Sequence, residues 1–253
     1  MIREDFHVHT TFCDGKNTPE EMVCAAIEKG MTTIGFSGHS PLRVGDGEKW
    51  AMSEAGAAEY RREITRLKER YAGQIRILCG VEQDLCSETG TEEYDYVIGA
   101  VHCLSKDGKY VSVDNTEADQ KDSVSRLYGG DWYAFAEDYY RAVGQVSGKT
   151  KCDIIAHFDL VAKFNEDEKL FDENHPRYVK AWQAAADRLL ACGVPFEINT
   201  GAISRGYRTV PYPAMPIYRY LKDHGARFLL SSDSHSAGTL CFQFDRWEQE
   251  YKL

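Results

Sequence analysis

The stretch IREDFHVH at residues 2–9 ends in two histidines that a single valine separates. In a strand, residues two apart point to the same face, so both imidazoles can reach one ion. A related stretch, TIGFSGH at residues 33–39, is an apolar run that stops abruptly at a histidine. We interpret both stretches as buried strands, because β-branched and aromatic residues crowd together and turn signals follow them.

The same pattern, an apolar run that ends in a polar residue, occurs five more times along the chain. The further runs cover residues 75–82, 96–102, 153–157, 194–199 and 227–235. Helical patterns separate most of the runs, and strands that alternate with helices predict parallel strands joined by crossovers. Seven such units in residues 1–253 predict a single domain built as a closed or nearly closed (β/α) barrel.

Helix signals support this alternation. Thr18-Pro19-Glu20-Glu21 is a capping box with proline at the first helical position, and Gly30 is expected to end that helix. The charged, periodic segment 53–71 is typical of a solvated outer helix. Three more helices are expected at residues 132–146, 176–192 and 213–224.

Composition limits the classes of function. Hydrophobic residues make up 43% of the 253-residue chain, as in ordinary globular proteins, and no run approaches the ~20 apolar residues that span a bilayer. The charged start of the chain does not resemble a signal peptide, and the eight scattered cysteines form no C-x-x-C pair, so we expect a cytoplasmic protein with reduced thiols. A net charge of −10 argues against a nucleic-acid partner, but a small phosphorylated substrate is compatible with bound metals. The oligomeric state has no signature here.

The predicted strand ends carry the chemistry. In a (β/α) barrel the active site lies at the C-terminal ends of the strands. Here those ends carry His7, His9, His39, Glu82, His102, His157, Asn199, Asp233 and His235, which include six of the eight histidines. Asp14 follows the first pair in a turn, and Asp233-Ser234-His235 repeats its two-residue spacing. So many ligands suit two or three divalent metals that share a bridging carboxylate, for which Glu82 is our candidate, and mixed nitrogen and oxygen ligands favour zinc, iron or manganese.

Two basic residues are candidates for binding a phosphate group. Lys163 lies beyond His157, and Arg205 follows the Asn199-Thr200-Gly201 turn, while Arg208 is a nearby competitor. Arginine can bind two phosphoryl oxygens at once. Two cysteines, Cys13 and Cys103, adjoin ligand positions, and we interpret both as packing residues.

Several short motifs occur together and in order along the chain. They are Asp5-Phe6-His7-Val8-His9-Thr10, Asp14-Gly15, Gly38-His39-Ser40, Gly80-Val81-Glu82, Ala100-Val101-His102, Ala156-His157 and Ser232-Asp233-Ser234-His235. This set resembles the polymerase and histidinol phosphatase (PHP) family along essentially the whole chain. The resemblance implies a distorted, TIM-like (β/α)7 barrel with a trinuclear metal site.

The resemblance also implies how the ligands are shared. One metal would take His7, His9, Glu82 and Asp233, a second Glu82, His102 and His157, and a third Asp14, His39 and His235. Within the family, the chain is most similar to the stand-alone histidinol-phosphate phosphatases, whose phosphate-binding strand resembles FEINTG at residues 196–201 followed by Arg205. Where a second phosphate-binding basic residue is expected, this chain offers Lys163.

The hypothesis from sequence is therefore hydrolysis of L-histidinol phosphate to L-histidinol and phosphate, in histidine biosynthesis, by a hydroxide that bridges the metals. Glu82, Asp233 and His157 are the candidate catalytic residues, and a metal-bound water or a strand-end histidine would protonate the leaving group. One alternative is a broader phosphoesterase that acts on sugar phosphates or nucleotides. Two weaker alternatives are a non-catalytic polymerase-accessory metal-binding module and a metal-dependent amidohydrolase, for which no strand-end lysine is available to be carbamylated.

Overall fold

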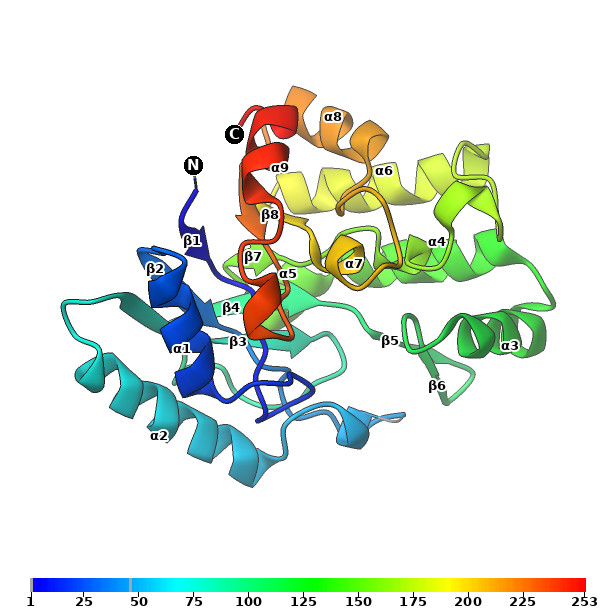
Figure 1. Cartoon of the computed structure of the whole chain (residues 1–253). Helices are drawn as coiled ribbons and strands as arrows, with labels where there is room; N and C mark the ends of the chain where they lie inside the picture. Colours follow the sequence, from blue (N-terminus) through cyan, green and yellow to red (C-terminus); the bar gives the residue numbers. More distant parts are fainter. Residues whose placement is uncertain (1, 46) are drawn as a thin grey trace.

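The computed structural model describes residues 2–45 and 47–253, and a parallel sheet of seven strands runs through its centre (Figure 1). The strands are β1 (Glu4–Asp5), β2 (Thr33–Phe36), β3 (Arg76–Asp84), β4 (Tyr96–Ala100), β7 (Ile154–Ile155), β8 (Phe196–Asn199) and β9 (Phe228–Ser231). They pair side by side in that order, and each pairing is parallel. All seven predicted strands are confirmed, although most end a few residues before the polar side chain expected at their tip.

The two ends of the sheet meet at the side that carries the histidines. An isolated parallel bridge joins Val8 to Ser234, and the backbone N–H of His9 donates to the carbonyl of Ser234 at 2.8 Å. The buried Asp5 carboxylate accepts the N–H of Ser232 at 3.0 Å, which ties β1 to the end of β9. The sheet is therefore a nearly closed, TIM-like barrel, and its first and last strands meet as expected.

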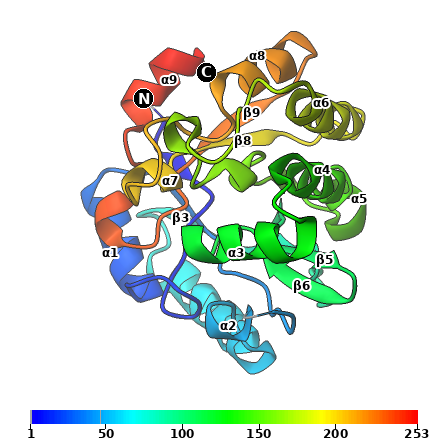
Figure 2. The same cartoon turned by 90° about the vertical axis from the view of Figure 1, so that its right-hand side faces the viewer.

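Helices surround the sheet, as Figure 2 shows. The longer ones are α1 (Pro19–Glu28), α2 (Glu54–Arg70), α4 (Trp132–Val143), α6 (Pro176–Leu190), α8 (Met215–Asp223) and α9 (Phe244–Tyr251). The helix predicted at 132–146 is shorter in the structure. It ends at Val143, and a separate short helix, α5 (Val146–Thr150), follows. None of the described helices has the length and apolar character needed to cross a bilayer.

Several elements were not predicted. They are the antiparallel hairpin of β5 (Cys103–Lys106) and β6 (Lys109–Ser112), the helices α3 (Glu117–Tyr128) and α7 (Gly201–Ser204), and the 3₁₀ turns η1 (Gly47–Lys49), η2 (Leu160–Ala162), η3 (Glu166–Glu168) and η4 (Ala237–Thr239). The hairpin and α3 form an insertion between β4 and β7, and α3 lies across the side that faces the viewer in Figure 2. This insertion contributes to the wall of the site described below.

Tyr96 fills part of the barrel interior beneath the site. Its hydroxyl donates to the carbonyls of Phe6 and Phe36, at 2.6 and 3.0 Å. A Cβ on Gly80 would lie 2.3 Å from the Tyr96 ring, so only glycine fits at that position of β3. Because side chains two apart in a strand share a face, Gly80 and Glu82 both point inward, and Glu82 lies one step nearer the histidines.

The capping box of α1 is present as predicted. The Thr18 hydroxyl accepts the N–H of Glu21, and the Glu21 carboxylate accepts the N–H of Thr18 at 2.8 Å. We expect Thr18→Ala to lower the free energy of unfolding by about 1 kcal/mol, because it leaves an end N–H of the helix without its partner. Chemical denaturation would measure the loss, with Thr18→Ser as the control that keeps the hydroxyl. Equal stability of all three proteins would contradict the assignment of this cap.

Candidate metal centre

The polar strand ends converge on one cavity of about 240 Å³. Its wall holds Asp14, His39, Glu82, His102, His157, Asp233 and His235 together with Trp50, Ser112, Asp114, Asn115, Leu160, Lys163, Arg205 and Tyr207. His7 and His9 lie immediately behind this wall and are fully buried. The structure therefore brings all nine predicted metal ligands to one place, from strand ends far apart in the sequence.

Glu82 lies at the centre of this group. Its Oε2 is 3.2 Å from His7 Nε2 and 2.9 Å from His39 Nδ1. Its Oε1 is 2.9 Å from His157 Nε2 and 3.3 Å from His102 Nε2. His9 Nε2 also lies 3.5 Å from Oε2, so this carboxylate faces five imidazoles, three on Oε2 and two on Oε1, as a bridging ligand requires.

A second carboxylate, Asp233, faces the first pair of histidines. Its Oδ1 lies 3.2 Å from His9 Nε2 and 3.8 Å from His7 Nε2. His7, His9 and Asp233 form a set whose ligand atoms all lie within 4.8 Å of one another. With Glu82 they make the first ligand set that the family resemblance implies.

The remaining ligands form a third group at the rim of the cavity. Asp14 Oδ2 is 3.2 Å from His235 Nε2, and Asp14 Oδ1 is 3.6 Å from His39 Nε2. His9 Nδ1 also lies 3.6 Å from Asp14 Oδ1, so this group contains His9 besides the three expected residues. The sets are therefore less separate than the resemblance implies, because His9 and His39 each adjoin two of them.

Burial and mutual contact set the charge of these groups. Burial alone would raise the pKa of Glu82, but the imidazoles of His7, His102 and His39 outweigh it and hold that pKa well below its usual range. Burial, reinforced by His235 and His39, lowers the pKa of His9 to about 3. Glu82 is therefore ionised and the His9 imidazole neutral at pH 7, which are the forms that bind metal ions. The carboxylates outweigh burial and raise the pKa of His7, His39 and His102, so a metal ion would displace protons from these three imidazoles.

Two buried ring nitrogens indicate that the nine predicted metal ligands, here called the cage, bind cations. His7 Nε2 and His9 Nε2 face carboxylate oxygens, yet neither makes a hydrogen bond of acceptable geometry with any residue that the structure describes. A buried ring nitrogen without a partner is costly, and a metal ion between it and the carboxylates would satisfy both. Nitrogen and carboxylate donors at this density fit divalent metal ions.

Two acidic residues that sequence reasoning missed orient the histidines. Glu197 Oε2 lies 2.9 Å from His7 Nδ1, and Glu197 Oε1 accepts the backbone N–H of His157 at 2.6 Å. Asp84 Oδ2 lies 3.2 Å from His102 Nδ1. A carboxylate on one ring nitrogen fixes the tautomer and leaves the other nitrogen for the metal. A glutamate between Phe196 and Ile198 in a buried strand was the available sequence signal.

We expect Glu197→Gln to weaken metal binding by about 10- to 100-fold, because the amide holds the His7 ring less firmly and leaves it less basic. Metal titration followed by calorimetry would measure the change. Glu250→Gln, a charge change at an exposed residue of the outer helix α9, is the control. Unchanged affinity in the Glu197 variant would contradict the orienting role.

The two predicted phosphate-binding residues lie on the cavity wall, and the third candidate does not. Arg205 Nη2 donates to Asp233 Oδ2 at 2.9 Å, and Arg205 Nη1 lies 2.8 Å from His235 Nδ1. Lys163 Nζ donates to Asp114 Oδ2 at 2.9 Å. Arg208 is buried elsewhere, where it donates to the carbonyl of Ala162, so it is a structural residue.

The cysteines are not assembled as ligands. All eight lie within the described residues, and none forms a disulfide there. Cys13 Sγ lies 3.5 Å from His9 Nδ1, but no group of metal-ligand geometry among the described residues includes it or Cys103. Of the tyrosines near residue 210, Tyr207 lines the cavity, whereas Tyr218 packs in α8 against Tyr251.

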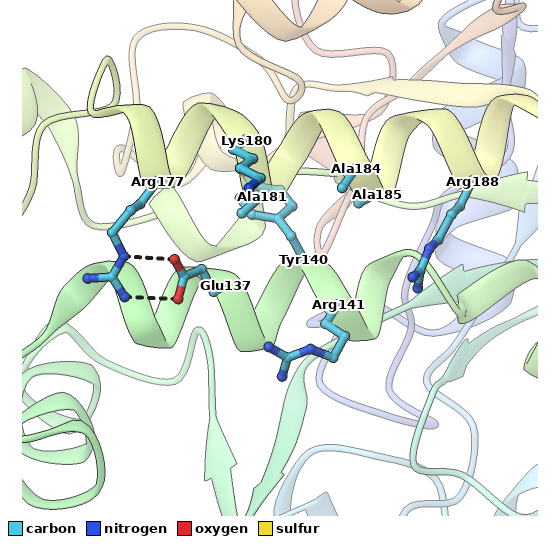
Figure 3. A pocket seen from close by; sticks show the side chains of 9 residues that line it. All are labelled: Glu137, Tyr140, Arg141, Arg177, Lys180, Ala181, Ala184, Ala185 and Arg188. Atoms are coloured by element: carbon cyan, nitrogen blue, oxygen red, sulfur yellow. Dashed lines mark hydrogen bonds and ion pairs between the residues drawn. The ribbon is translucent and has the colours of Figure 1, made fainter.

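A second cavity, of about 310 Å³, lies in the groove between α4 and α6 (Figure 3). Arg177 at one end makes a two-point interaction with Glu137 across the groove. Arg188 lies at the other end, Arg141 lies between the two ends on α4, and Ala181, Ala184 and Ala185 lie along α6. Histidines and converging carboxylates do not line this groove, so its chemistry differs from that of the strand ends.

Comparison with known proteins identifies the family. The family model described as the PHP domain matches residues 5–201, more than half of the chain. The chain belongs to the PHP domain family. This PHP chain is 27% identical to the histidinol-phosphatase of Bacillus subtilis (strain 168), over 97% of this chain and 98% of that relative.

Two solved structures share the PHP barrel. The hisK chain from Listeria monocytogenes superposes with a TM-score of 0.84 at 21% identity and covers 96% of this chain and 99% of its own. The histidinol phosphate phosphatase of Lactococcus lactis subsp. lactis, solved with zinc, L-histidinol and phosphate, gives a TM-score of 0.67 at 20% identity, over 99% of this chain and 92% of its own. The predicted distorted (β/α)7 architecture is confirmed.

Proposed function

We propose that this protein is a metal-dependent phosphomonoesterase that hydrolyses L-histidinol phosphate to L-histidinol and phosphate. The observation that carries the proposal is the placement of Arg205 beside Asp233, which puts a guanidinium at the edge of a cage of histidines and carboxylates. The full-length match to a histidinol-phosphatase supports the choice of substrate. The zinc, L-histidinol and phosphate bound by the Lactococcus lactis relative agree with it.

The cage would hold two or three divalent ions. His7, His9, Glu82 and Asp233 form one set, Glu82 with His102 and His157 a second, and His9, Asp14, His39 and His235 a third. Zinc, iron and manganese all suit these nitrogen and oxygen donors, and the absence of thiolates among them argues against a purely structural zinc site. Bound divalent ions supply a Lewis acid for the phosphoryl oxygens and make a coordinated water acidic near neutral pH.

The chain's own groups bind and orient the ester. Arg205 offers two N–H groups to the phosphoryl oxygens, and Lys163 offers an ammonium from the segment that follows His157. Glu82 and Asp233 remain ionised, since the imidazoles and Arg205 outweigh the effect of burial on their pKa values. With His157, whose Nε2 lies 2.9 Å from Glu82, they are the residues to which we assign catalysis, because all three line the cavity.

Kinetics across a panel of phosphate esters tests the substrate assignment. We expect kcat/KM for L-histidinol phosphate to exceed that for sugar phosphates and nucleotides by at least about 100-fold, which corresponds to ~2.7 kcal/mol of discrimination. Similar values for all esters would replace the assignment with a broader PHP phosphoesterase. If protein loaded with zinc, iron or manganese hydrolysed none of them, a non-catalytic metal-binding module would be the better account.

A further inference from the structure

Asp114 is the one carboxylate on the described cavity wall that stands outside the cage. The wall holds four carboxylates, and the other three are Asp14, Glu82 and Asp233, which face histidines. Asp114 is not in any of the groups with metal-ligand geometry in the described part of the chain. It follows β6, so it belongs to the insertion between β4 and β7 and not to a barrel strand.

The backbone around Asp114 is held firmly. The N–H of the preceding residue, Val113, donates to the carbonyl of His102 at 2.8 Å. Gln120, buried in α3, donates to the carbonyl of Val113 at 2.8 Å and to that of Val161 at 3.1 Å. These contacts join the insertion to a metal-ligand strand end and to the segment that carries Lys163. A side chain on such backbone can define a binding position before the ligand arrives.

One oxygen of Asp114 is committed, and the other is available. Lys163 Nζ donates to Asp114 Oδ2 at 2.9 Å and to the Asp114 carbonyl at 2.7 Å. Asp114 Oδ1 makes no hydrogen bond with the residues that the structure describes, and its side chain is 22% exposed at the cavity. Burial opposes ionisation, but the adjacent Lys163 ammonium outweighs it and holds the pKa of Asp114 below its usual range. The free oxygen therefore carries negative charge near neutral pH.

A negative charge at this place in the cavity would stabilise a positively charged group of the substrate. The phosphoryl group needs cations around it, and a substrate that also carries an ammonium group brings a positive charge into the same space. In an ester of a 2-amino alcohol that ammonium is on the carbon next to the ester carbon, so it cannot leave the neighbourhood of the phosphate. An ionised carboxylate that binds no metal and keeps one oxygen open reduces this repulsion, because that oxygen accepts a charge-assisted hydrogen bond beside the ion pair with Lys163.

We infer that Asp114 binds the ammonium group of the substrate through its free carboxylate oxygen and thereby selects phosphate monoesters of 2-amino alcohols. The inference rests on the proposed function, since it concerns the alcohol portion of the same substrate. It makes the β5–β6 insertion the specificity-determining wall of the cavity, and it leaves the phosphoryl group to Arg205 and Lys163.

The test compares two esters that differ only in the amino group. One is L-histidinol phosphate, and the other is the imidazolylpropyl phosphate that lacks the amine. We expect the unmodified protein to favour the amine-bearing ester by about 10- to 100-fold in kcat/KM, as for a hydrogen bond between charged groups. In Asp114→Asn this ratio should fall to about one. The ratio is the readout, because any effect that passes through Lys163 changes both esters alike.

Two further variants sharpen the result. Asp107→Asn removes the same charge from the turn of the same hairpin, at an exposed residue outside the cavity, and should keep the full ratio. Asp114→Glu keeps the charge and should keep part of the preference. If Asp114→Asn does not fold, inhibition of the unmodified protein by L-histidinol, compared with the alcohol that lacks the amine, still measures the preference at equilibrium.

The possible results separate the two proposals. Equal kcat/KM and equal inhibition constants for the paired compounds in the unmodified protein would overturn the role of Asp114 while leaving the phosphatase intact. A preference that survives in Asp114→Asn would overturn it as well. Hydrolysis of sugar phosphates or nucleotides with no hydrolysis of either imidazole ester would instead contradict the proposed function.

Discussion

Asp233→Asn is expected to lose bound metal and phosphatase activity together. Asp233 Oδ1 lies 3.2 Å from His9 Nε2, and Asp233 Oδ2 accepts Arg205 Nη2 at 2.9 Å, so one side chain joins the cage to the phosphate-binding arginine. Removing its charge should weaken metal binding by more than about 100-fold. Mutation of a group that only orients a ligand already lowers metal affinity by ~10- to 100-fold. The measurement is metal content and phosphate release on the same sample.

Asparagine is the better replacement at this position, and a control is available. Asp233 has a φ of 48°, in the left-handed region that asparagine tolerates and alanine does not, so Asp233→Asn separates the loss of charge from backbone strain. His9→Ala removes a ligand on the neighbouring segment that follows β1 and should give the same joint loss. Asp223→Asn, at the exposed end of α8, should change neither property. Full activity in the Asp233 or His9 variant would exclude this cage as the active site.

Arg205→Ala is expected to lower kcat/KM by about 100- to 1,000-fold while most of the metal stays bound. Removing one hydrogen-bond donor to a charged transition state lowers the rate by ~10²- to 10³-fold. Arg205 contributes no metal ligand, and its side chain, which lines the cavity, is 27% exposed. Arg205→Lys should recover only part of the activity, because an ammonium cannot bind two oxygens in the planar geometry of arginine. Steady-state kinetics on L-histidinol phosphate would measure both variants.

The control for this series is Arg219→Ala, which removes an exposed arginine of α8 and should leave kinetics unchanged. If Arg205→Ala retained normal kcat/KM, the phosphate group would have to be bound by the metals and Lys163 alone. If it lost its metal as completely as Asp233→Asn, Arg205 would act through the cage and not through the substrate. Either result would contradict the role that we assign to it.

The barrel could be predicted because its strands are short and buried on both faces. Such strands are near-continuous apolar runs, and a histidine or carboxylate at the end of each run stands out against them. The capping box of α1 was visible for a similar reason, since Thr18 and Glu21 make their contacts within three residues. Local signals of this kind do not depend on the rest of the fold.

What escaped prediction depends on contacts between distant residues. Glu197 meets His7 across 190 positions, and only the closed barrel brings them together. Asp114 is placed by the β5–β6 insertion, for which no element was predicted from the sequence. The dipeptide Asp107-Gly108 is a strong signal for a two-residue hairpin turn and could have located that insertion from sequence.

The division of ligands among the metals was the least accessible feature. Sequence spacing pairs His7 with His9 and Asp233 with His235, but it does not say which set each ring nitrogen serves. The structure shows that His9 faces Asp233 with Nε2 and Asp14 with Nδ1. Which nitrogen points where depends on side-chain packing, and no local pattern in the chain encodes it.

The most direct test is to remove and restore the metal while measuring phosphate release from L-histidinol phosphate. We expect chelated protein to be inactive, and activity to return in step with the binding of two or three zinc, iron or manganese ions per chain. Hydrolysis at the full rate by metal-free protein would contradict the central claim, because the cage of histidines and carboxylates would then have no part in the reaction.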